Sequence, residues 1–197
     1  MTLTLYYHPG TCSLAPTIAL EEAGADYRLE KADIRGKPPE WLEINPKGSV
    51  PALGTDRGVL TENPVILGYV AQTHPEANLA PVDDSYAFGA LQSFNMYIAS
   101  TIHPLFARAF FIPDTDDAKA KARELLVKKL TILHDHLFQG PWVRGESYTI
   151  ADPYLCVMER WAEKNGLFSD GAFPKLDEHL RRMLARPAVQ RAIEKHG

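Results

Sequence analysis

Cys12 stands where a predicted strand gives way to a predicted helix. Residues 3–7 alternate and are rich in strand formers, Pro9-Gly10 breaks the strand, and residues 13–23 follow a helical pattern in which Ser13 is the predicted N-cap. A helix N-terminus carries partial positive charge and unpaired N–H donors, and both favour a thiolate over a thiol. The pattern predicts a reactive cysteine with a lowered pKa. The alternative is an inert small residue in a turn.

The residue three positions after Cys12 limits the redox chemistry of this segment. A two-cysteine redox helix would carry its partner thiol there, but the position holds Ala15. No disulfide can close within the helix, so Cys12 must act alone or pair with an external thiol. The other cysteine, Cys156, falls inside an apolar helical pattern and is predicted to be inert core.

Two further segments present polar groups beside prolines. Pro51 opens a short strand, and the Val50–Pro51 bond is either trans at a sheet edge or cis, with the backbone groups of Val50 turned outward. Asn63 precedes Pro64 and is a predicted helix N-cap. It either caps the helix alone or presents a helix N-terminus to an anionic ligand, while Glu62 beside it could bind an ammonium group.

His103 and Asp152 are the candidate residues in the second half of the chain. His103 falls on a predicted helix over 86–111, and a partly buried, hydrogen-bonded histidine is the alternative to a functional one. Asp152 ends Thr149-Ile150-Ala151-Asp152, a capping box before an apolar run. We therefore predict that Asp152 fixes a helix start and is not a catalytic carboxylate.

The elements that must position these residues form two predicted domains. Residues 1–78 give the order βαβαββα, in which the first two strands are parallel. Residues 74–85 lose periodicity and gain proline, which indicates a domain boundary. Residues 86–197 are predicted to be all helical, with long helices over 86–111 and 115–138. Pro104 should bend the first of these.

Bulk composition excludes several classes of protein. At 197 residues the chain has room for one large or two small domains. A net charge of −4 gives no support for nucleic-acid binding. No apolar run reaches the length of a membrane span, and no signal-peptide pattern is visible. With only two cysteines there is no disulfide framework, so a cytoplasmic setting is expected.

Four segments, taken in order and spacing, resemble a glutathione transferase of the bacterial, beta-like group over essentially the whole chain. They are the catalytic-loop segment 6–14, the cis-proline segment 45–53, the γ-glutamyl-binding turn 60–66 and the capping box 149–152. The resemblance implies a fold of class α/β plus all-α. A thioredoxin-like domain (1–78) would bind glutathione, a helical-bundle domain (86–197) would follow, and the protein would be a homodimer.

The resemblance also implies that glutathione is bound as co-substrate, in extended form, on the first domain. Val50 would pair through its backbone with the cysteinyl part of glutathione, beside a cis Pro51. Glu62 and Asn63 would hold the γ-glutamyl group, and Lys37 is a candidate for the glycine carboxylate.

In the same resemblance, Cys12 would face the glutathione sulfur, with Ser13 and Tyr6 nearby, and His103 would approach from the helical domain. The implied activity is conjugation of glutathione to electrophilic small molecules, as in detoxification. A cysteine at the site adds thiol-transferase or peroxidase activity on disulfides and peroxides through Cys12. The acceptor pocket is expected between the domains, lined by residues such as Tyr7, His8, Phe106 and Phe110.

Two positions differ from the family pattern. Asn63 stands where serine is usual, and Met96 stands where beta-like relatives often carry asparagine, seven residues before His103. Asn95 is displaced from that position by about 100° around the helix. These differences leave open an alternative, a transferase-like binding or regulatory module with weak or lost glutathione binding. A third reading is a glutathione-using isomerase or dehalogenase.

Overall fold

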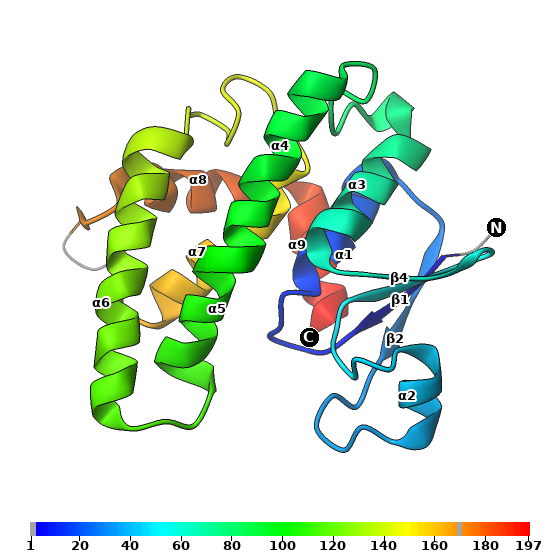
Figure 1. The fold of residues 1–197 in the computed structure, drawn as a ribbon. Coiled ribbons are helices and arrows are strands. Elements are labelled where there is room, and N and C mark those ends of the chain that lie inside the picture. The colour runs from blue at the N-terminus through cyan, green and yellow to red at the C-terminus, as the bar shows by residue number, and fades with distance from the viewer. Residues whose placement is uncertain (1–2, 169–170) are drawn as a thin grey trace.

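The computed structural model describes residues 3–168 and 171–197, and its first unit is a mixed sheet with three helices (Figure 1). The order is β1 (Leu3–Tyr7), α1 (Leu14–Ala23), β2 (Tyr27–Lys31), α2 (Pro39–Ile44), β3 (Ala52–Thr55), β4 (Gly58–Thr61) and α3 (Asn63–Thr73). The sheet order is β2-β1-β3-β4, with β1 parallel to β2 and the other pairs antiparallel. This confirms the predicted thioredoxin-like βαβαββα arrangement.

The second unit is helical, as predicted. After the short turn η1 (Pro75–Ala77) come α4 (Ser85–Tyr97), η2 (Ile98–Ile102), α5 (His103–Phe106), η3 (Ala107–Phe111), α6 (Asp116–Ile132), η4 (Leu133–Leu137), α7 (Ala151–Lys164), α8 (Pro174–Leu184) and α9 (Pro187–His196). The only pairing of strand type in the described part of this unit is an isolated bridge between Trp142 and Gly145. The exact domain boundary, between residues 78 and 86, stays a prediction.

The helix predicted over 86–111 is continuous, but its winding widens on both sides of Pro104. In η2 the N–H of His103 donates to the carbonyl of Ile98, five residues back, which is the π-helical pattern. Proline has no N–H to donate and its ring crowds the preceding turn, so a wider turn relieves the conflict. The stretch η2–α5–η3 carries His103 to the edge of the first unit.

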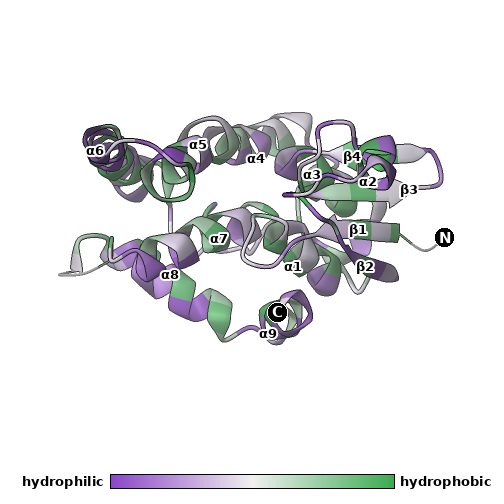
Figure 2. Cartoon of the chain, turned by 90° about the horizontal axis from the view of Figure 1, so that it is seen from below, coloured by the Kyte–Doolittle hydropathy of each residue, from purple (hydrophilic) through white to green (hydrophobic). Residues whose placement is uncertain are grey.

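Helices α1 and α7 form the middle layer of the molecule, with α3 to α6 on one side and α8 and α9 on the other (Figure 2). Residues 14–20 of α1 are all buried, because α3, α7 and α9 pack around this helix. One continuous apolar core crosses both units. The loop before α1, which carries Cys12, is therefore held by residues from both ends of the sequence.

The start of α7 shows why Asp152 is buried. Its Oδ2 accepts hydrogen bonds from the N–H and the hydroxyl of Thr149, at 2.6 and 3.0 Å, and its Oδ1 accepts from the N–H of Val143 at 2.8 Å. His179 Nε2 lies 3.1 Å from the same Oδ1. These contacts confirm the structural role predicted for Asp152.

Arg181, Arg182 and Arg186 resemble a solvated face in sequence, and for Arg186 this interpretation is wrong. Its guanidinium donates to both carboxylate oxygens of Glu22 on α1, at 2.6 and 2.9 Å, and lies over the ring of Tyr148. Arg186 thus ties the start of α9 to α1. Within the ranges described, the helices are too short or too polar to cross a membrane.

Candidate active site

A cavity of about 840 Å³ lies between the two units and is lined by seven of the predicted site residues: Cys12, Lys37, Val50, Pro51, Glu62, Asn63 and His103. Aromatic side chains from the helical unit complete its wall, namely Phe110, Phe111, Tyr154 and Trp161. Residues that are far apart in the sequence therefore meet in one place, as the resemblance implies.

Cys12 lies on the loop before α1, and its Sγ is 3.6 Å from the carbonyl oxygen of Val50. Burial raises the pKa of the Cys12 thiol to about 12, although a hydrogen bond from the Asn63 side chain lowers it in part. The predicted lowering of the pKa is wrong, because the loss of water around the sulfur outweighs the partial charge of the helix end. Cys12 is a thiol at neutral pH.

The backbone near Val50 is fixed by the turn that precedes it. Asn45 donates from Nδ2 to the carbonyl of Ser49 at 2.7 Å, and the Val50–Pro51 bond is cis. Gly48 has φ +61°, and a Cβ there would lie 2.9 Å from Cδ of Lys37. The positive φ favours glycine at this position, and the Lys37 stem packs closely over it. The Lys37 side chain thus lies across the turn at the rim of the cavity.

Helix α3 begins one residue earlier than predicted, with Glu62 and not Asn63 as its N-cap. The carbonyl of Glu62 accepts the first helical hydrogen bond, from Ile66 at 3.0 Å, and Glu62 adopts φ 73°. Its carboxylate is exposed and pairs with Nζ of Lys47 at 2.7 Å. Asn63 is buried, and its Oδ1 has no hydrogen-bond partner within the described residues.

His103 reaches the cavity from α5 and shares a hydrogen bond with Tyr154, which lies in the apolar run of α7. The His103 Nδ1 lies 3.0 Å from the hydroxyl of Tyr154, and the imidazole packs against Trp161. Burial lowers the pKa of His103, against a smaller opposite effect of Glu62, so the imidazole is neutral at pH 7. Burial also raises the pKa of Tyr154, which keeps its hydroxyl protonated.

Tyr154 is the functional candidate that the sequence analysis missed. Its position in the apolar run of α7 is typical of a core residue, and the ring is indeed 2% exposed. Its hydroxyl is the one sequence feature that could have indicated a role at the site, since a buried tyrosine needs a polar partner. The Asn63 side chain forms hydrogen bonds with both Cys12 and Tyr154, and each bond partly offsets the rise in pKa that burial causes. Cys12, Asn63, Tyr154 and His103 therefore form one polar cluster at the cavity.

Ser13 and Tyr6 are not among the residues that line this cavity, and their expected place near the glutathione sulfur stays a prediction. Ser13 is fully buried, and its Oγ lies 3.0 Å from Nε2 of His196 on α9 and 2.7 Å from the hydroxyl of Thr11. Ser13 is the N-cap of α1, as predicted, but its side chain forms no capping hydrogen bond. Tyr6 packs against Trp41 instead.

Two of the four residues expected to line the acceptor pocket, His8 and Phe110, do line this cavity, and the other two, Tyr7 and Phe106, do not. Phe106 is fully buried in the core, and Tyr7 packs against His196, with ring centroids 4.8 Å apart. Neither contributes to the wall. Trp161 and Phe111 take their place.

Comparison with known proteins gives matches over the whole chain. Residues 1–72 match the family model "Glutathione S-transferase, N-terminal domain", and residues 98–187 match "Glutathione S-transferase, C-terminal domain". The glutathione S-transferase GstA of Escherichia coli O157:H7 is 38% identical over 202 residues, which covers 99% of each chain. The glutathione S-transferase GST-4.5 of Xanthomonas campestris is 33% identical, also over 99% of each chain.

Solved structures agree with this match. A sphingomonad glutathione S-transferase complexed with glutathione is 37% identical, with a TM-score of 0.91 over 98% of each chain. A bacterial beta-class glutathione S-transferase from Sphingomonas chungbukensis is 36% identical, with the same TM-score and coverage. A glutathione transferase from Methylococcus capsulatus is 39% identical, with a TM-score of 0.90 over 99% of this chain and 98% of that one.

Proposed function

The chain belongs to the glutathione S-transferase family, and on this premise we propose that the cavity around Cys12 binds glutathione and presents its sulfur to an electrophilic small molecule. One observation carries the proposal. A single cavity brings together the Cys12 thiol and the Glu62–Asn63 turn of the first unit with His103 and Tyr154 of the helical unit. The protein acts as a glutathione transferase.

The polar groups of the cavity match the two charged ends of glutathione. The γ-glutamyl end carries an ammonium and a carboxylate, which suit the Glu62 carboxylate and the N-terminus of α3. Lys47 is paired with the Glu62 carboxylate and adds a cation at this end of the site. Lys37 lies at the opposite side for the glycine carboxylate, and the backbone of Val50 pairs with the cysteinyl part.

Conjugation needs a glutathione thiolate and a place for the proton that it loses. The glutathione sulfur forms a bond to the electrophilic carbon, the leaving group departs with its electron pair, and the thiol proton passes to a base or to water. Cys12 stays protonated, so its S–H can donate a hydrogen bond to the thiolate. His103 is neutral and half-buried, so it is the candidate base in the cavity.

A redox activity through Cys12 is the second candidate function, because the thiol lies in the cavity. In a mixed-disulfide step the Cys12 thiolate attacks a disulfide sulfur and releases the other half as a thiolate. Burial raises the pKa of Cys12 to about 12, which disfavours the thiolate at pH 7. We therefore propose conjugation as the main activity and disulfide exchange as a side activity.

We also propose that the protein is a homodimer in a cytoplasmic setting. Val59, Val65, Tyr86 and Met96 are exposed apolar side chains on β4, α3 and α4, and such exposed apolar surface supports a homodimer. Both cysteines are free thiols, which supports a reducing, cytoplasmic setting.

The proposal is tested by the steady-state rate with glutathione and an activated aryl chloride. Glu62→Gln removes the charge offered to the ammonium, so the KM for glutathione should rise about tenfold, with kcat changed less. Glu40→Gln, an exposed position on α2 outside the cavity, is the matched control and should leave KM unchanged. A parent enzyme no faster than the uncatalysed reaction, or equal KM values for the two variants, would contradict the proposal.

A further inference from the structure

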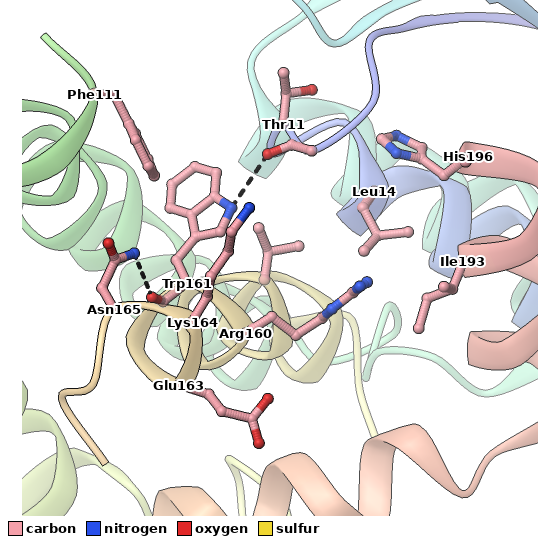
Figure 3. Close-up of a pocket in the computed structure, with 13 residues that line it drawn as sticks. Thr11, Leu14, Phe111, Arg160, Trp161, Glu163, Lys164, Asn165, Ile193 and His196 are labelled. Carbon is pink, nitrogen blue, oxygen red and sulfur yellow. Dashed lines mark hydrogen bonds between the residues drawn. The ribbon is translucent and has the colours of Figure 1, made fainter. Parts of the chain in front are cut away.

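The last helix of the chain ends against the Cys12 loop (residues 8–13). His196, the last residue of α9, lines a cavity of about 350 Å³ behind this loop, and in Figure 3 its ring points toward the loop at Thr11. His196 is 3% exposed, and its ring packs against Tyr7 with centroids 4.8 Å apart. A polar ring that is buried in this way needs a hydrogen-bond partner, and the loop supplies it.

Three side chains around Cys12 form a directed chain of hydrogen bonds. The Thr11 hydroxyl donates to the carbonyl of His8 at 2.7 Å, so its only proton is used there. The Ser13 hydroxyl, which lies 2.7 Å from Thr11 Oγ1, must therefore donate to Thr11, and its own oxygen can then only accept. His196 Nε2 lies 3.0 Å from Ser13 Oγ, so Nε2 carries the ring proton and donates it to Ser13. Burial lowers the pKa of His196 to about 4, so the neutral ring at pH 7 has this one N–H.

This chain of hydrogen bonds holds the loop on both sides of Cys12. Thr11 and Ser13 are the two sequence neighbours of Cys12, and the N–H of His8 also donates to Ser13 Oγ, at 3.3 Å. Cys12 lines the active-site cavity between the two units, whereas His196 does not. His196 can therefore act on Cys12 only through the loop.

Helix α9 has other contacts that dock it on α1. Arg186 pairs with both carboxylate oxygens of Glu22. Arg191 and Lys195 both pair with the carboxylate of Glu21, and the apolar face of α9 is buried as well. The contact at the last residue of the helix is therefore available to position the loop.

We propose that His196 is a positioning residue, whose Nε2–H bond to Ser13 Oγ holds the loop in the conformation that buries Cys12 in the active-site cavity. Because the bond is itself buried, its removal leaves Ser13 with one partner fewer and lets the loop shift. The burial of Cys12 is a property of the protein alone, whereas the effect of His196 on turnover rests on the proposed function.

The rate at which iodoacetamide alkylates Cys12 at pH 8 tests the proposal without glutathione. His196→Phe keeps a ring against Tyr7 but removes the donor, so Cys12 should become less buried and react about fivefold faster. His196→Gln, whose amide N–H can reach Ser13 Oγ, should stay within about twofold of the parent. Lys195→Gln removes an ion pair from the same turn of α9 and is the matched control, with no change expected. Cys12→Ser supplies the background, and circular dichroism verifies that each variant is folded.

A double variant shows whether His196 acts through Ser13. Ser13→Ala alone should accelerate alkylation about as much as His196→Phe, and the two changes together should add less than about twofold, because both remove the same bond. Equal rates for the parent and His196→Phe would overturn the proposal, as would an equal gain in Lys195→Gln or in His196→Gln, or fully additive effects in the double variant. If His196→Phe does not fold, an alkylation rate of Ser13→Ala equal to that of the parent overturns it.

Turnover with glutathione and an activated aryl chloride gives a second readout. His196→Phe should lower kcat about tenfold and change the KM for glutathione less than about threefold, because the displaced loop carries Cys12 and not the groups that hold the ends of glutathione. An unchanged kcat in His196→Phe would overturn the positioning role. A parent enzyme without activity would contradict the proposed function instead, and the alkylation rates would still decide the role of His196.

Discussion

Cys12 lies at a loop end where two opposing effects act on its thiol. The start of α1 offers partial positive charge, which lowers the pKa of a nearby thiol. Burial removes water from the thiolate, which raises the pKa, and the result is a pKa of about 12. The position of Cys12 at a strand–helix junction can be predicted from the sequence. Its burial cannot, because the groups that cover it come from Val50, Asn63 and Tyr154.

The alkylation rate of Cys12 measures this balance. Because only the thiolate reacts and its fraction rises with pH up to the pKa, the rate with iodoacetamide should increase about tenfold per pH unit from pH 7 to pH 10. Cys12→Ser supplies the background from Cys156, which is fully buried. A rate that levels off near pH 7 would show a thiolate and would favour the redox function over conjugation.

At the scale of elements, the short segments that begin helices hold the site in place. Helix α7 begins at a buried carboxylate that is bonded to Thr149 and Val143, and the ring of His179 lies between Asp152 and Glu159, at 3.1 and 2.8 Å. Burial lowers the pKa of His179, but the two carboxylates outweigh it and raise the pKa to about 9. Because α7 carries Tyr154 and Trp161, this network positions one wall of the active-site cavity.

Removal of the Asp152 carboxylate should therefore affect stability first. Asp152→Ala leaves the buried N–H groups of Thr149 and Val143 without their partner and removes one of the two carboxylates that bind His179. It should lower the free energy of unfolding by about 3–5 kcal/mol. Urea denaturation followed by circular dichroism measures this change. Asp117→Ala breaks an exposed ion pair on α6 and should cost less than about 0.5 kcal/mol. Equal midpoints for the two variants would show that the Asp152 network is not structural.

Some elements can be predicted from the sequence better than others. Local patterns predict the strands, the helices and the capping box, because periodicity and caps depend on neighbours in the chain. The place of Ser13 depends on His196, which is 183 residues away. The role of Tyr154 depends on the Asn63 turn and on α5. Such long-range contacts have no local signature, so the sequence does not predict that Ser13 turns toward His196 or that Tyr154 lines the cavity.

At the scale of the whole molecule, the last helix returns to the first one (Figure 1). Helix α9 packs on α1, His196 is bonded to Ser13, and Arg186 is bonded to Glu22. The all-helical unit therefore covers the apolar face of α1 and supports the Cys12 loop from behind. The two units share one core, although the sequence presents them as two successive domains.

A shared core predicts that the first unit does not fold alone. A fragment of residues 1–78 exposes the α1 residues that α7 and α9 cover in the full chain, so it should lack a cooperative thermal transition. The full chain should unfold in one transition, with tryptophan fluorescence and circular dichroism coinciding. A fragment that melts cooperatively, or two separate transitions in the full chain, would show that the units are independent.

The measurement that tests the central claim most directly is a calorimetric titration of the reduced protein with glutathione, alongside Asn63→Ser and Glu62→Gln. We predict micromolar to millimolar binding by the parent, and about tenfold weaker binding by Glu62→Gln. Binding by Asn63→Ser alone would mean that the site is built but closed by the asparagine, as in a transferase-like module without activity. If neither the parent nor Asn63→Ser bound glutathione, the assignment of the Cys12 cavity would be contradicted.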